Sequence, residues 1–130
     1  CDWSSDVCSS DLYFRTLNFS TMSEIKNLIS QLVEFRDARD WSQFHNSKDL
    51  AIAITIEAGE LLEAFLWKSP EAVDPAKVKE ELADILAYCL LLANRHNLDI
   101  KTIVEEKIRL NETKYPVEKA KGNASKYTDL

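Results

Sequence analysis

Two long segments, residues 47–67 and 75–96, carry apolar side chains on nearly every side of a helix. A helix that is apolar most of the way round must be buried on most of its sides. Between the two segments, Asp74 followed by Pro75 is a typical helix start. With only 2 glycines and 3 prolines among 130 residues, the chain has too few turn residues for an all-β fold. The sequence therefore predicts an all-α protein.

One further helix is expected on each side of this pair. The first runs from Ser23, a favourable N-cap residue, to near Arg39, and the last begins after Asp99 and ends before Pro116. From about residue 117 the chain becomes a lysine-rich tail, which we expect to be irregular. Four helices cannot bury the central two completely. We therefore expect a four-helix bundle-like fold that assembles as a homo-oligomer.

Residues 1–21 follow neither a helical nor a strand period, and the run SSDV at 4–7 is echoed by SSDL at 9–12. The segment also lacks the basic start and apolar centre of a signal peptide. It resembles a translated sequencing adapter, so we expect a non-native leader, with a genuine disordered leader as the alternative. The expected domain is then 22–130, which begins at the only methionine.

Charge and cysteine content limit the expected partners. The formal net charge of −6 disfavours nucleic acid, and no stretch reaches the roughly 18–20 apolar residues that cross a bilayer. After the first 21 residues Cys89 is the only cysteine, so we expect no disulfide within the chain and a thiol packed among apolar neighbours. With no export signal, the expected location is cytoplasmic.

Four carboxylates are paired on the two central helices. Glu57 and Glu60 stand three residues apart on one helical face, and Glu81 and Asp84 repeat this spacing on the next helix. Both pairs are set among apolar residues. Helices joined by a short loop pack antiparallel, which can bring the pairs face to face. Clustered carboxylates need a cation between them, and Mg²⁺, or Mn²⁺ in its place, prefers such oxygen ligands.

The paired acids also admit interpretations other than a magnesium site. A Glu-x-x-Glu pair usually marks a solvated helix face, and a di-iron site would need a Glu-x-x-His pair, which neither His45 nor His96 supplies. Glu63 and Glu80 project away from the two pairs. They are expected at the surface or as accessory ligands.

Five motifs, in order along the chain, resemble one family of enzymes. They are RDWSQFH (39–45), EAGELLEAFLWKS (57–69), EELADILAY (80–88), NETKYP (111–116) and KYTDL (126–130). The two acidic motifs resemble the E-x-x-E…E-x-x-D signature of the all-α MazG-like nucleoside triphosphate pyrophosphatases. The other three resemble the dCTP pyrophosphatase branch of that family.

The resemblance implies that the chain hydrolyses a nucleoside triphosphate between the α and β phosphates, releasing a monophosphate and pyrophosphate and so sanitising the nucleotide pool. The four acids would bind magnesium, with Glu57 as the preferred general base. The related enzymes favour a tetramer over a dimer. The implied nucleotide contacts are Trp41, His45, Trp67, Tyr88, Lys107, Asn111 and Lys114.

Two points widen these expectations. Vertebrate members carry a histidine where this chain has Leu32, so the expected substrates include dCTP, its modified forms and other pyrimidine deoxynucleotides. Trp67 is equally expected as a core residue, because it ends an apolar segment.

Two other functions stay open: a non-catalytic helical oligomerisation module, and a sensor that binds nucleotides without cleaving them. The clustered carboxylates favour the enzyme, because a packing module gains nothing from them.

Overall fold

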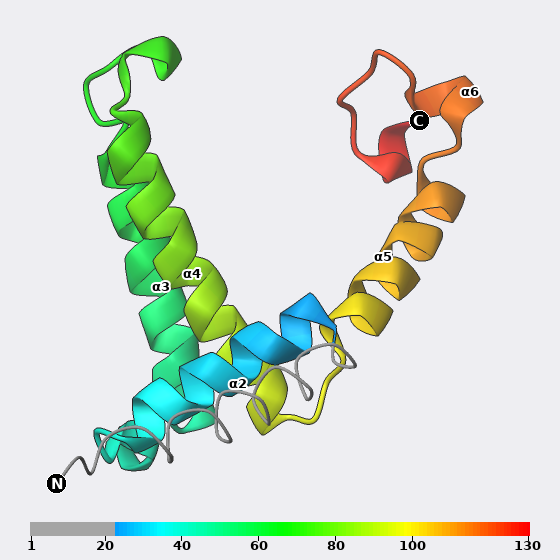
Figure 1. Cartoon of the computed structure of the whole chain (residues 1–130). Coiled ribbons are helices and arrows are strands. Elements are labelled where there is room, and N and C mark those ends of the chain that lie inside the picture. The colour runs from blue at the N-terminus through cyan, green and yellow to red at the C-terminus, as the bar shows by residue number, and fades with distance from the viewer. Residues whose placement is uncertain (1–22) are drawn as a thin grey trace, which may run out of the picture. The chain divides into compact units, whose positions relative to one another are not determined.

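The computed structural model describes residues 23–130, and every regular element in this range is helical (Figure 1). The predicted all-α fold is confirmed, whereas the expected leader, residues 1–21, lies outside the described residues. In chain order the elements are α2 (Glu24–Asp37), η1 (Trp41–Phe44), α3 (Ser47–Glu63), η2 (Pro70–Ala72), α4 (Pro75–Arg95), α5 (Ile100–Lys114), α6 (Val117–Ala120) and η3 (Tyr127–Asp129).

The long helices begin at polar cap residues. The side chains of Ser23, Asn46 and Asp99 each accept a hydrogen bond from the backbone N–H three residues further on. The carboxylate of Asp74 accepts the N–H of Ala76, and the proline between them opens α4. These bonds satisfy N–H groups that the first turn of a helix leaves without a partner. The predicted helix starts are therefore confirmed.

One predicted helix end is wrong, and the tail is more regular than expected. The helix expected to reach Trp67 ends as α3 at Glu63. Beyond it, the N–H groups of Phe65 and Leu66 bond to carbonyls only three residues back, and the left-handed backbone of Trp67 (φ 60°) then redirects the chain. Such bonds tighten and terminate a helix. The tail from residue 117 is also less irregular than expected, because α6 and η3 form within it.

The chain divides into two compact units, and the boundary falls within α4 between Leu92 and Ala93. In the first unit, α2 leads through η1 into α3, and α3 and α4 run antiparallel beside each other (Figure 1). The second unit contains the end of α4 followed by α5, α6 and η3.

Among residues 23–130 few side chains are fully buried. The buried apolar residues are Leu50, Leu91 and Ala93. Large apolar side chains on α3 and α4 are instead 46–73% exposed: Ile52, Ile56, Leu62, Leu82 and Leu86. The central helices thus carry apolar surface that the described chain does not cover. No helix in the described range is both long and apolar enough to cross a membrane.

Candidate functional site

Side chains from α3 and α4 meet in an acidic cluster formed by Glu57, Glu81 and Asp84. One carboxylate oxygen from each of these residues lies within 4.8 Å of the oxygens from the other two. The two acids of α4 are three residues apart, so both face the side of the helix that lies against α3. The antiparallel pairing therefore brings the two acidic motifs together.

Glu60, the fourth predicted ligand, lies at the edge of the acidic cluster. Its side chain is exposed and shares hydrogen bonds with Glu57 and Glu81. It is not one of the three acids whose oxygens converge. The structure thus brings all four predicted acids into contact, with three at the centre.

The acidic cluster concentrates negative charge where water is scarce. Glu81 is only 2% exposed and Glu57 is half-buried, whereas Asp84 is exposed. Burial raises the pKa of Glu57 to about 7, and the hydrogen bond and charge of Glu60 and the charges of Asp84 and Glu81 act in the same direction. Close carboxylates resist ionising together. Near neutral pH and without a metal, Glu57 is therefore partly protonated.

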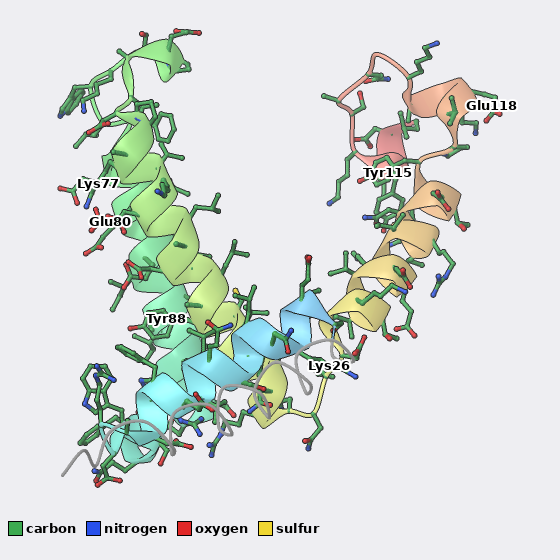
Figure 2. All side chains as sticks on the ribbon, in the orientation of Figure 1. Lys26, Lys77, Glu80, Tyr88, Tyr115 and Glu118 are labelled. Atoms are coloured by element: carbon green, nitrogen blue, oxygen red, sulfur yellow. The ribbon has the colours of Figure 1, made fainter. Side chains whose placement is uncertain are left out.

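One cation already reaches the acidic cluster. Nζ of Lys77, in the first turn of α4, forms an ion pair with Glu81 and lies 3.5 Å from a carboxylate oxygen of Glu80 (Figure 2). The hydrogen bond from Lys77 lowers the pKa of Glu81, although burial acts in the opposite direction. Glu80 is 67% exposed, as expected for a surface residue. The sequence predicted no role for Lys77.

The donor set suits a hard divalent cation. Mg²⁺ and Ca²⁺ hold oxygen ligands at about 2.0–2.6 Å, so ligands on opposite sides of one ion lie about 4–5 Å apart. The oxygens of the acidic cluster already lie within that span. Water and phosphate oxygens would complete the coordination of such an ion.

Tyr88 lies beside the acidic cluster, further along α4 (Figure 2). Burial raises the pKa of its phenol, and so do the negative charges of Glu57 and Asp84, which must therefore be near. Its ring meets the imidazole of His45 edge to face, with 6.2 Å between the centroids. Two predicted nucleotide contacts thus lie together next to the carboxylates.

His45 is held as a neutral ring. Burial lowers the pKa of its imidazole, and the charge of Arg36 lowers it further. The Nδ1 atom is buried without a hydrogen-bond partner among the described residues. In a neutral imidazole the protonated nitrogen can donate a hydrogen bond to a ligand, and the other nitrogen can accept one.

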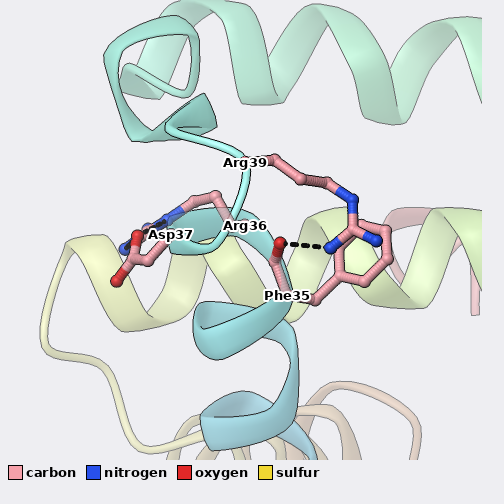
Figure 3. A network of polar contacts seen from close by, with 4 residues as sticks. All are labelled: Phe35, Arg36, Asp37 and Arg39. Carbon is pink, nitrogen blue, oxygen red and sulfur yellow. Dashed lines mark hydrogen bonds and ion pairs between the residues drawn. The ribbon is translucent and has the colours of Figure 1, made fainter.

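Trp41 belongs to an aromatic stack that sequence reasoning missed. The guanidinium of Arg39 lies 3.6 Å from the ring centroid of Phe35, and its Nη1 donates to the Phe35 carbonyl at 2.9 Å (Figure 3). The indole of Trp41 meets the same Phe35 ring edge to face, with centroids 5.9 Å apart. Beside this stack, Arg36 pairs with Asp37 at 2.8 Å (Figure 3). The stack holds Trp41 while leaving 43% of it exposed.

Trp67 is not a core residue of this chain, so that alternative is wrong. Its side chain is 94% exposed, and its backbone adopts the left-handed conformation. This conformation is unfavourable for a bulky residue by about 1–3 kcal/mol. Neither burial nor local backbone preference explains a tryptophan here, and its role as a nucleotide contact stays a prediction.

The three remaining predicted contacts, Lys107, Asn111 and Lys114, lie on α5 in the second unit. Lys107 and Asn111 are exposed. Nζ of Lys114 lies 5.0 Å from the ring centroid of Tyr127, and that ring meets Tyr115 edge to face at 6.0 Å. The C-terminal turn is therefore fastened to the end of α5.

Residues 52–130 match the MazG-like family. The chain belongs to this family. Among the curated relatives of this MazG-like chain, dCTP pyrophosphatase 1 of Mus musculus is 40% identical over 124 residues, which cover 89% of the chain and 73% of the relative. The Homo sapiens protein of the same name is 37% identical over 118 residues, covering 85% of the chain and 68% of the relative.

A solved structure agrees with this assignment. The crystal structure of a pyrophosphatase from Archaeoglobus fulgidus DSM 4304 matches with a TM-score of 0.68 and 37% sequence identity, covering 73% of this chain and 94% of that chain. The family resemblance predicted from the motifs is confirmed. The roles of individual site residues stay predictions.

Proposed function

We propose that this chain is a Mg²⁺-dependent nucleoside triphosphate pyrophosphohydrolase that converts a pyrimidine dNTP, dCTP or a modified form of it, to the monophosphate and pyrophosphate. The observation that carries the proposal is the acidic cluster on α3 and α4 of a MazG-like chain. The name dCTP pyrophosphatase 1, borne by its curated relatives, supports the choice of substrate. Such an enzyme removes unwanted nucleotides from the pool.

Glu57, Glu81 and Asp84 would hold the metal, and Glu60 would complete the site from its edge. When bound, a divalent ion neutralises phosphate charge and lowers the pKa of a water ligand. Glu57 stays our preferred proton acceptor among the four acids, and a bound divalent ion would lower its pKa from the metal-free value of about 7. Buried Glu81 stays ionised beside Lys77 and keeps a negative charge on the site.

The aromatic residues would bind the base of the nucleotide. Trp41 and Tyr88 present partly open rings, of which Tyr88 lies beside the acidic cluster, and a base stacked on such a ring gains about 1–3 kcal/mol. Trp67 and His45 would add stacking and a hydrogen bond. For Lys107, Asn111 and Lys114, contact with phosphate or sugar rests on the family motif alone.

We further propose that the chain acts as a homo-oligomer, a tetramer rather than a dimer, in the cytoplasm. Exposed Ile52 and Ile56 on α3, and Leu82 and Leu86 on α4, each form a pair on one helical stripe that another copy could cover. Ile56, in the α3 stripe, is 54% exposed. Ile56→Glu should therefore lower the mass measured by analytical ultracentrifugation, and a tetramer mass retained by that variant would remove the α3 stripe from the interface.

Turnover with each dNTP tests the reaction directly. The purified chain with Mg²⁺ should release pyrophosphate and a monophosphate, with dCTP or a modified pyrimidine dNTP as the best substrate. Release of inorganic phosphate with a diphosphate would mean a different bond is cut. Intact nucleotide after long incubation would favour the sensor.

Two matched variants on α3 test the site. Glu60 and Glu63 are both exposed glutamates, but only Glu60 bonds to the acidic cluster. Glu60→Gln should reduce turnover by about 10- to 100-fold, the usual effect of disturbing a metal site, while Glu63→Gln should not. Equal activity in the two variants would remove Glu60 from the site.

A further inference from the structure

Lys77 occupies a position that the stability of α4 does not explain. It is the third residue of the helix, which begins at Pro75. A cation in the first turn faces the positive end of the helix dipole and is disfavoured there. A lysine placed four residues before a glutamate is also the weaker orientation of such a pair. Another interaction must account for the pairing of Lys77 with Glu81.

Within residues 23–92, Lys77 is the one cation found in contact with the carboxylate of Glu81. Glu81 is 2% exposed, and its other contacts, Glu57 and Glu60, are acids. A buried carboxylate without a counter-charge is strongly unfavourable. Lys77 itself is 47% exposed, so its stem lies along the surface and its Nζ enters from the solvent side.

The lysine also has a second partner outside the acidic cluster. Nζ lies 3.5 Å from an oxygen of Glu80, whose side chain is 67% exposed. A flexible four-carbon stem lets an ammonium change partners with little rearrangement. Lys77 can therefore leave Glu81 for Glu80 without losing its ion pair.

We propose that Lys77 is an internal counter-cation of the acidic cluster, which neutralises Glu81 while no metal is bound and moves to Glu80 when a divalent ion takes its place. The inference rests on the proposed metal site. Lys77 is then a positioning residue: it keeps the empty site from carrying an unpaired buried anion. A metal must displace it to bind, so Lys77 sets the metal concentration at which the site fills.

Binding of Mn²⁺ alone to the full chain, followed by the electron paramagnetic resonance signal of free Mn²⁺, tests this without any nucleotide. Lys77→Met should bind Mn²⁺ about tenfold more tightly than the natural chain, because one competing unit charge is gone. Lys79→Met removes the same charge from an exposed position on α4 and should leave the affinity unchanged. Lys77→Arg keeps the charge and should restore weak binding. Unchanged or weaker binding by Lys77→Met would overturn the proposal.

Thermal unfolding separates this role from a merely structural ion pair. In EDTA, Lys77→Met should melt at a lower temperature than Lys79→Met, and saturating Mn²⁺ should remove the difference. A deficit of the same size with and without Mn²⁺ would indicate a structural ion pair and contradict the inference.

If Lys77→Met does not fold, the natural chain still gives an answer. Mn²⁺ should increase the acetylation of Lys77 by an N-hydroxysuccinimide ester, measured by mass spectrometry relative to Lys79, because the ammonium is released from Glu81. An unchanged ratio at saturating Mn²⁺ would contradict the inference. A chain that binds Mn²⁺ in this way but hydrolyses no nucleotide would disprove only the proposed reaction. Absence of Mn²⁺ binding would disprove the metal site and this inference with it.

Discussion

The imidazole of His45 meets the ring of Tyr88 edge to face, with 6.2 Å between the centroids, and so joins the segment before α3 to the middle of α4. Tyr88→Ala removes this contact and should lower the free energy of unfolding by about 2–3 kcal/mol. Tyr88→Phe keeps the ring and should lower it by less than about 1 kcal/mol. Urea denaturation followed by circular dichroism measures both. Equal losses would show that the hydroxyl, not the ring, provides the stability.

The raised pKa of Glu57 predicts a dependence of stability on pH in the absence of metal. Its pKa rises from 4.5 to about 7 on folding, so between these values the folded chain binds more protons than the unfolded chain. The contribution of Glu57 to stability is therefore full below pH 4.5 and is lost as pH rises through this window. Melting temperatures in EDTA at a series of pH values measure it.

Comparison with Glu57→Gln isolates that contribution. His45, whose pKa is lowered, adds the opposite slope below its ordinary value of 6.5, but it does so in both proteins. The melting temperature of the natural chain minus that of Glu57→Gln should therefore fall as pH rises from 4.5 to 7. A flat difference would mean that folding does not shift the pKa of Glu57, and a rising one that folding lowers it; either would contradict the prediction.

The helix starts and the acidic pairs follow from local rules, and the sequence predicted them. Ser23 and Asp74 carry cap signals, and a spacing of three residues places Glu81 and Asp84 on one face whatever the rest of the fold does. The end of α3 was not predictable in this way. Apolar side chains continue to Trp67, whereas the helix ends at Glu63, after which tighter backbone bonds and then the left-handed Trp67 redirect the chain.

The sequence also did not predict which side chains contact each other in the folded chain. Lys77 lies on the same face of α4 as several other residues. It pairs with Glu81 because that carboxylate is buried. Arg39 could have pointed into solvent but lies on Phe35, where cation and ring attract. Spacing gives the residues within reach of a long side chain, and burial decides among them.

A test of nucleotide binding can use two exposed aromatic residues of the same short helix, η1. Trp41→Leu should raise KM for dCTP about tenfold with kcat nearly unchanged, because a lost stacking contact is worth about 1–3 kcal/mol. Phe44, which is 61% exposed and has no assigned contact, provides the control. Initial rates over a range of dCTP concentrations measure both. Equal KM values for Trp41→Leu and Phe44→Leu would remove the indole from the nucleotide site.

The contacts of Tyr127 with Lys114 and Tyr115 predict how the C-terminal turn is held. Tyr127→Ala removes a cation–π and an aromatic contact, worth together about 1–2 kcal/mol, so amide exchange in η3 should quicken about tenfold. The amide of Asp129, bonded to the Lys126 carbonyl at 2.8 Å, is the natural reporter. Lys121→Ala, an exposed change elsewhere in the tail, is the control. Unchanged exchange in Tyr127→Ala would mean that the turn is stable without this contact.

The central claim is that Glu57, Glu81 and Asp84 form one divalent metal site. An anomalous difference map from crystals grown with Mn²⁺ locates the ion directly. We predict a peak coordinated by carboxylate oxygens of these three residues, with Nζ of Lys77 displaced from Glu81. Saturating Mn²⁺ with no peak at the acidic cluster, and Lys77 still paired with Glu81, would contradict the account.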